Sequence, residues 1–265
     1  MIQQEWSRLY SSVKLFIVEH SVFINRCSNA LLALTRLRPK HRCGLCQALS
    51  THRLCTSCQQ QFLYSPRYNC TCCALPLRHS ALFCGECLKQ RPHFDHTFSP
   101  YAYQSPLSNL LLRFKYASDL FIGKALAEIF VEKIQQHYQQ QHIPLPDMIT
   151  PVPLHWRKQW QRGFNQAYFF SHHIHQRLAI PIFKKVRRIK AAPAQKNLDR
   201  KKRLKNLQHS FSVTSPLNGQ HIAIIDDVMT TGATANALAL TLKNSGAGKV
   251  SIWVLARTPK GNGLT

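Results

Sequence analysis

The stretch HIAIIDDVMTTGAT, residues 221–234, decides how this chain is expected to fold. Four apolar residues at 222–225 lead into the adjacent acids Asp226 and Asp227, and a segment of threonines, glycine and alanine follows at 230–234. An apolar run of this length is typical of a strand buried on both faces of a parallel sheet. Hydroxyl-rich residues before an apolar helical pattern are typical of a helix N-terminus. We therefore predict a buried strand that ends at Asp226, a tight turn, and a helix.

The residues after this strand favour a phosphorylated ligand. Backbone N–H groups at a helix N-terminus bind anions, because the positive end of the helix dipole lies there. We predict that a phosphate group binds in this way to Thr230, Thr231, Gly232, Ala233 and Thr234. The carboxylates of Asp226 and Asp227 are suited to ribose hydroxyls, directly or through Mg²⁺. The alternative is an acidic pair that only caps the next helix, although the chain holds just 11 Asp and Glu against 35 Lys and Arg.

Strand and helix patterns alternate on both sides of this stretch. Apolar or alternating runs predict strands over residues 96–103, 148–152, 182–186, 222–226 and 249–255. Helical patterns cover residues 107–116, 122–140, 165–178 and 234–244. This alternation predicts an α/β fold, a mostly parallel sheet with helices on both faces. The loop 157–166 and the loop after Asp226 should then meet beyond the carboxyl ends of the strands, where such sheets bind ligands.

The cysteines predict two zinc sites in a small module. Eight of the ten cysteines form four pairs with two residues between the members, a spacing that lets both thiolates of a pair reach one Zn²⁺. The pairs are Cys43/Cys46, Cys55/Cys58, Cys70/Cys73 and Cys84/Cys87. Consecutive pairs or interleaved pairs would each complete two tetrahedral sites. The alternative of four disulfides fits a secreted protein, and no secretory signal is evident here.

The charge of the chain predicts a polyanionic partner. The formal net charge is +24 and the isoelectric point is near 10.1, which favours nucleic acid or an anionic membrane surface. Residues 184–205 hold eleven Lys and Arg and one acid. We interpret this segment as one that closes over pyrophosphate or contacts nucleic-acid phosphates, and a solvated run of charge is the alternative.

Three regions follow from these patterns. We expect a helical N-terminal extension over residues 1–40, a zinc-binding module over 41–95, and the α/β domain over 96–265. The opening MIQQEWSRLY lacks the basic start and apolar core of a secretory signal, and polar residues interrupt the apolar stretch at 13–34, so no transmembrane span is expected. We therefore expect a cytoplasmic protein.

Several motifs together resemble a known family. The segment 222–234 alone resembles the 5-phosphoribosyl-1-diphosphate (PRPP) signature of type I phosphoribosyltransferases. Combined with the four cysteine pairs, RFKY at 113–116, PVPLHWRKQWQRGFNQ at 151–166 and QKNLDRKKRLKNL at 195–207, the chain resembles the ComF family and its GntX-like members. Ala74, after the third cysteine pair, stands where that family usually has glycine.

The resemblance implies a fold, a set of ligands and a cellular role. It implies a type I phosphoribosyltransferase-like fold behind a zinc module, acting in natural competence (DNA uptake) or in the use of DNA as a nutrient. Asp226 and Asp227 would be the catalytic acids, with Mg²⁺, and pyrophosphate would bind Arg162 and Gly163. Single-stranded DNA would contact the basic side chains Lys196, Arg200, Lys201, Lys202, Arg203 and Lys205. A DNA-processing protein such as a helicase is a further candidate partner.

The sequence leaves open whether the chain is an enzyme. A phosphoribosyltransferase, a non-catalytic single-stranded DNA-binding protein and a PRPP-sensing regulator all fit these residues. They differ in whether DNA binding needs Asp226 and whether it responds to PRPP.

Overall fold

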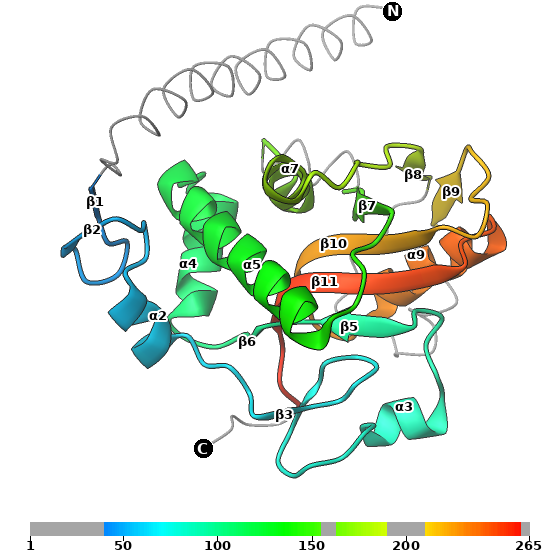
Figure 1. Ribbon diagram of the computed structural model, residues 1–265, viewed down its shortest axis with the longest axis horizontal. Helices are drawn as coiled ribbons and strands as arrows, with labels where there is room; N and C mark the ends of the chain where they lie inside the picture. Colours follow the sequence, from blue (N-terminus) through cyan, green and yellow to red (C-terminus); the bar gives the residue numbers. More distant parts are fainter. Residues whose placement is uncertain (1–39, 155–162, 190–209, 261–265) are drawn as a thin grey trace, which may run out of the picture.

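A central parallel sheet organises the computed structural model, which describes residues 40–154, 163–189 and 210–260 (Figure 1). The sheet strands are β5 (His96–Phe98), β6 (Tyr101–Ala102), β7 (Met148–Pro151), β10 (His221–Met229) and β11 (Lys249–Arg257). Their order is β5-β11-β10-β7, with β6 also on β11, and every pair is parallel. The expected parallel sheet is confirmed, and the expected extension 1–40 falls, apart from its last residue, outside the described residues.

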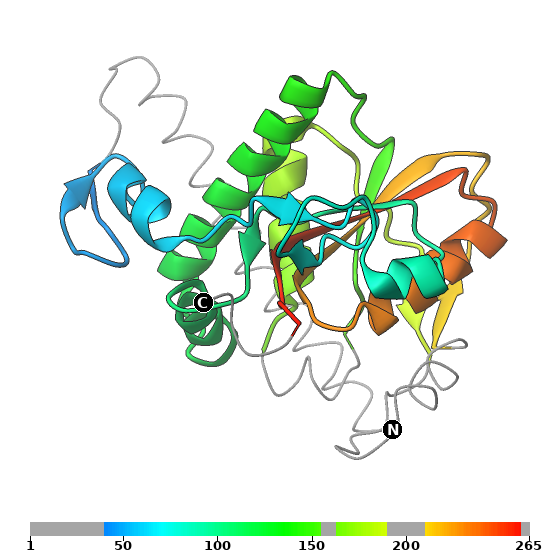
Figure 2. The ribbon, with the colours of Figure 1, turned by 90° about the horizontal axis from the view of Figure 1, so that it is seen from below.

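Helices cover both faces of the sheet (Figures 1 and 2). The helices are α4 (Leu107–Tyr116), α5 (Leu120–Gln141), α7 (Gln166–Leu178) and α9 (Ala233–Asn244). Alternate residues of β10 point to opposite sides. Ala223 and Ile225 therefore join the core under α4, α5 and α7, whereas Ile222 and Ile224 join the core under α9. This confirms the predicted α/β class.

The helices of the α/β domain begin within two residues of their predicted positions, and two of these four start at a side-chain cap. Helix α4 has the predicted bounds. Helix α5 begins after Asp119, whose carboxylate accepts the N–H of Ile122 at 3.1 Å. Helix α7 begins after Asn165, whose side chain accepts the N–H of Ala167 at 3.0 Å. Both arrangements satisfy backbone donors that a helix leaves unpaired at its first turn.

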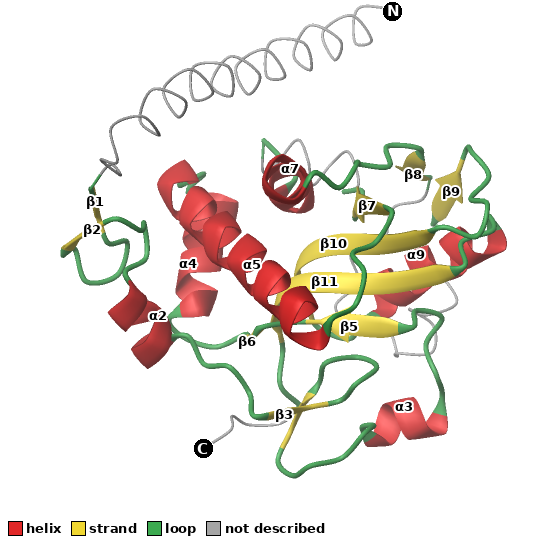
Figure 3. Ribbon diagram, in the orientation of Figure 1, coloured by secondary structure: helices red, strands yellow, loops and turns green. Residues whose placement is uncertain are grey.

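Short elements surround the sheet (Figure 3). Near the cysteines these are β1 (His41–Arg42), β2 (Leu49–Ser50), α2 (Thr56–Phe62), β3 (Tyr68–Asn69), β4 (Pro76–Leu77) and α3 (Gly85–Lys89). An antiparallel pair, β8 (Val186–Arg188) and β9 (Phe211–Val213), flanks residues 190–209, which lie outside the described part and include most of the basic segment 184–205. No helix in the described ranges is long and apolar enough to cross a bilayer.

Three strand predictions need correction. The run at 182–186 forms only a parallel bridge from Ile182 to Ile149, and the strand β8 begins later, at Val186. The run at 96–103 is split into β5 and β6 around Ser99 and Pro100, and proline has no N–H for a ladder. The strand predicted to end at Asp226 continues to Met229, because β11 supplies pairing partners as far as Arg257.

Candidate phosphate site and cysteine tetrads

The two adjacent acids near the end of β10 have different partners. Asp226 lines an open pocket on the α9 side. Asp227 is 7% exposed and its Oδ2 lies 2.6 Å from Nζ of Lys115 on α4. The structure therefore brings Asp226 to the residues 230–234 predicted to bind phosphate, which we call the phosphate loop. It gives Asp227 an ion-pair partner.

The predicted phosphate-binding residues line the same pocket as Asp226. Its walls are the end of β10, the loop 230–232, the first residues of α9 and two apolar residues of β11, around roughly 350 Å³ of space open to solvent. Gly232 has a φ of +75°, a conformation that favours glycine, and it turns the chain directly into α9. The hydroxyl of Thr231 accepts the N–H of Ala233 at 3.3 Å. Thr230, Thr231, Gly232, Ala233 and Thr234 thus converge on one helix N-terminus.

The electrostatics of Asp226 favour a bound cation. Burial raises the pKa of Asp226, and the neighbouring Asp227 raises it further. The N–H of Asp227, which donates to Asp226 Oδ1 at 2.9 Å, and the ammonium of Lys115 offset part of this rise in pKa. A cation in the pocket would relieve the cost of ionising Asp226.

The end of β7 lies beside the acids, as predicted. The N–H of Val152 donates to the carbonyl of Ile225 at 2.9 Å, and Nδ2 of Asn165 donates to the carbonyl of Val152 at 3.1 Å. Gly163 precedes this cap with a φ of +78°. Arg162 lies outside the described residues, as do the predicted DNA contacts Lys196, Arg200, Lys201, Lys202, Arg203 and Lys205. The two loops predicted to meet therefore start from neighbouring strand ends.

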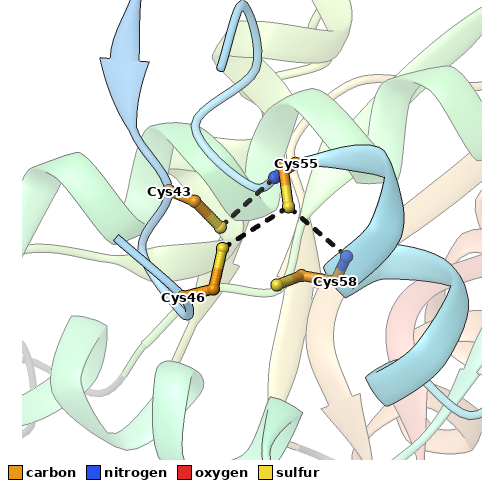
Figure 4. Close-up of side chains that lie close together, drawn as sticks. All are labelled: Cys43, Cys46, Cys55 and Cys58. Atoms are coloured by element: carbon orange, nitrogen blue, oxygen red, sulfur yellow. Dashed lines mark hydrogen bonds between the residues drawn. The ribbon is translucent and has the colours of Figure 1, made fainter. Parts of the chain in front are cut away.

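The first cysteine tetrad consists of Cys43, Cys46, Cys55 and Cys58, which converge on one centre (Figure 4). The sulfurs of Cys46 and Cys55 are 3.7 Å apart. The N–H of Cys55 donates to the sulfur of Cys43 at 3.3 Å. Gly44 allows close packing here, since a Cβ at this position would lie 2.6 Å from the terminal carbon of the Ile122 side chain on α5, which would have to shift. The tetrad is thereby held against α5.

The second tetrad consists of Cys70, Cys73, Cys84 and Cys87, all buried. The sulfurs of Cys73 and Cys84 are 3.6 Å apart, and the N–H of Cys84 donates to the sulfur of Cys70 at 3.3 Å. Ala74, which follows the third cysteine pair, has a φ of +51°. This left-handed conformation favours glycine, and alanine adopts it at some cost.

Both tetrads fit zinc. Tetrahedral Zn²⁺ with Zn–S bonds of about 2.3 Å requires sulfurs about 3.8 Å apart, close to the separations above. Burial raises the pKa of the Cys43 thiol, but N–H groups of Cys55, Cys46 and Leu45 outweigh it and lower that pKa to about 6. No described cysteine forms a disulfide. Consecutive pairs share each site, which resolves the pairing left open by the sequence.

The two tetrads pack against different parts of the α/β core. The first belongs to the hydrophobic cluster of α4, α5 and α7, and the second to the cluster of α9. Arg53 beside the first tetrad pairs with Glu128 of α5, whereas the chain after the second tetrad reaches α9, where His93 N–H donates to Asn236 Oδ1 at 2.6 Å. Residues 41–95, expected as one module, thus pack against the hydrophobic clusters on both faces of the sheet.

Sequence reasoning did not assign two side chains that contact this site. Lys115 lies within the RFKY motif, and its place in that motif could have marked it as a candidate site residue. Arg257, at the end of β11, donates to the carbonyls of Met229 and Thr230. Nothing in the local pattern of β11 distinguishes this arginine from a surface residue.

Comparisons with known proteins give a consistent set of relatives. Competence protein F of Haemophilus influenzae is 34% identical over 223 residues, which are 82% of this chain and 96% of that protein. The DNA utilization protein YhgH of Escherichia coli K12 is 33% identical over 220 residues, with the same coverage. Competence protein ComFC of Bacillus subtilis is 26% identical over 215 residues, 78% of this chain and 85% of that protein. A scan against models of protein families gives no match.

Proposed function

The chain belongs to the ComF family of competence protein F and the DNA utilization proteins, and from this premise we propose that it acts in DNA uptake or utilization by binding a PRPP-like phosphorylated ribose with Mg²⁺, and single-stranded DNA. The names of these relatives support the cellular role. The observation that carries the ligand is that Asp226 and the loop 230–234 line one pocket at the carboxyl edge of a parallel sheet.

Each part of the pocket suits one part of such a ligand. The N–H groups and hydroxyls of residues 230–234 would bind the 5-phosphate at the start of α9. Asp226 would accept ribose hydroxyls or hold Mg²⁺, whose preferred ligands are carboxylate oxygens and water. Asp227 would act on Asp226 through electrostatics, while Lys115 balances its own charge. Arg162 and Gly163 would neutralise the pyrophosphate at the neighbouring strand end.

A transferase reaction would need few protein groups beyond those that bind the phosphate, the ribose and the pyrophosphate. When pyrophosphate leaves C1 of PRPP, positive charge develops on the ribose, so positioning and electrostatic stabilisation account for catalysis. Asp226 is the carboxylate of the described pocket and is suited to that task. A protein that binds the same ligand without turnover would use the same residues as a sensor.

A binding measurement tests the ligand. Isothermal titration of PRPP with Mg²⁺ should show heat with the wild-type chain and little with Asp226→Asn. Asp147→Asn is the matched control, because Asp147 is exposed and accepts the N–H of His221 at the opposite end of β10. Equal heats for all three proteins would end the PRPP proposal.

Single-stranded DNA binding has its own test. Counterion release predicts that each phosphate contact of a cationic side chain makes the slope of log affinity against log salt more negative by about 0.7 for single strands. Replacing Lys201, Lys202, Arg203 and Lys205 by glutamine should therefore make the slope shallower by about 3. An unchanged slope would remove this segment from the DNA site. Adding PRPP separates a sensor, whose DNA affinity changes, from a protein with two independent sites.

A further inference from the structure

Arg257 connects the second cysteine tetrad to the loop that follows β10. It is the last residue of β11 and only 6% exposed. Its Nε donates to the carbonyl of Cys73 at 3.0 Å, and its Nη1 donates to the carbonyl of Met229 at 2.9 Å. Nη1 also contacts the carbonyls of Thr230 and Thr258. One planar guanidinium therefore binds the backbone of Cys73 in the second tetrad on one side and the backbone at the start of the phosphate loop on the other.

The charge of Arg257 has no carboxylate partner among the described residues. Burial lowers the pKa of Arg257, and the nearby thiols of Cys73, Cys84 and Cys87 raise it. A buried cation needs a compensating charge. Four thiolates around one Zn²⁺ leave excess negative charge, so a filled second tetrad would supply it.

Other contacts keep the same two regions together. The N–H of Thr258 donates to the carbonyl of Met229 at 3.1 Å. Lys260 pairs with Glu86 of α3, the helix that carries Cys87. The first tetrad differs, because its ion pair and its close packing are with α5. The chain thus contains one tetrad joined to the loop and one that serves as an internal control.

We infer that Arg257 is a positioning residue through which metal in the second tetrad fixes the backbone of the phosphate loop. Loss of that metal would remove the compensating charge and release the carbonyls of Met229 and Thr230. Because coupling between two sites is reciprocal, loosening the loop should also weaken the hold on the metal. Only the effect on phosphate affinity rests on the proposed function.

The first test compares backbone signals without any ligand. Amide ¹H–¹⁵N signals of Thr230, Thr231 and Gly232 should shift or broaden in Arg257→Met and, to a smaller extent, in Arg257→Lys, which keeps the charge but not the planar fork. Arg53→Met is the matched control, since Arg53 is part-buried beside the first tetrad. Its loop signals should match those of the wild type. Unchanged loop signals in both Arg257 variants would overturn the inference.

The second test measures zinc itself. In a Cys46→Ser background the first tetrad is incomplete, so zinc release to a chelator reports the second tetrad. Adding Arg257→Met should speed that release about tenfold, the effect of losing one charge-assisted hydrogen bond. Equal release rates would contradict the coupling. If Arg257→Met does not fold, Arg257→Lys decides, with an acceleration in the same direction expected.

Titration with inorganic phosphate separates this inference from the proposed function. If the wild-type loop binds phosphate, Arg257→Met should bind it about tenfold more weakly, and equal affinity would count against Arg257. If the wild-type loop binds no phosphate, the proposed ligand fails, and the ligand-free signals and zinc release still decide the role of Arg257.

Discussion

The different partners of Asp226 and Asp227 predict different effects of two similar substitutions on the free energy of unfolding. Asp227→Asn would leave the ammonium of Lys115 without its partner at 2.6 Å, and the two side chains are only 10% and 14% exposed. Breaking a buried pair on one side costs about 3 kcal/mol at the low end of measured values. For a domain of this size that corresponds to a melting temperature lower by about 6–12 °C. Asp226→Asn should leave stability unchanged or raise it, because burial and Asp227 disfavour the charged form of Asp226.

Thermal and urea unfolding of the wild-type chain and three variants measure this difference. Lys115→Met combined with Asp227→Asn removes both charges and should recover most of the loss, since an apolar replacement of a buried pair is often neutral. Asp226→Asn is the control on the neighbouring residue. The reasoning is refuted if Asp227→Asn costs less than about 1 kcal/mol, the value of an exposed pair, or if Lys115→Met gives no rescue.

Three more predictions follow from the same contacts. Since the pKa of Asp226 is raised to about 7, Mg²⁺-dependent PRPP affinity should increase as the pH rises through that value, and Asp226→Asn should remove the increase. Metal analysis should find two zinc ions per chain and one in Cys46→Ser; two ions in that variant would contradict the tetrad. Burial, with His137, Lys249 and His221 nearby, lowers the pKa of His96 from 6.5 to about 4. As the pH is lowered through this window, His96 is protonated first in the unfolded chain, so the free energy of unfolding decreases. In an Asp226→Asn background, which removes an opposing contribution, His96→Gln should show a shallower fall; an equal slope would contradict it.

Local patterns predicted most of the fold. The helices were located from the apolar periodicity of their own residues, whereas the caps Asp119 and Asn165 became evident only in the structure. The parallel sheet followed from the alternation of strand and helix patterns. The cysteine spacing indicated two metal sites, and the sequence could not pair them because either pairing uses the same ligands.

The contents of the site were harder to predict where they depend on distant residues. The length of β10 is set by its register with β11, and the ion pair of Asp227 with Lys115 joins this strand to the distant helix α4. Arg257 contacts Cys73 across 184 positions of sequence, and no local periodicity records such a contact. The predicted roles of Arg162 and the basic segment remain predictions, because those residues lie outside the described ranges.

The most direct test is a crystal structure of the chain soaked with PRPP and Mg²⁺ and phased on zinc. The account predicts density for the 5-phosphate at the amides of residues 230–234, with the ribose or metal against the carboxylate of Asp226. A phosphate bound elsewhere, or a ribose with no contact to Asp226, would contradict it.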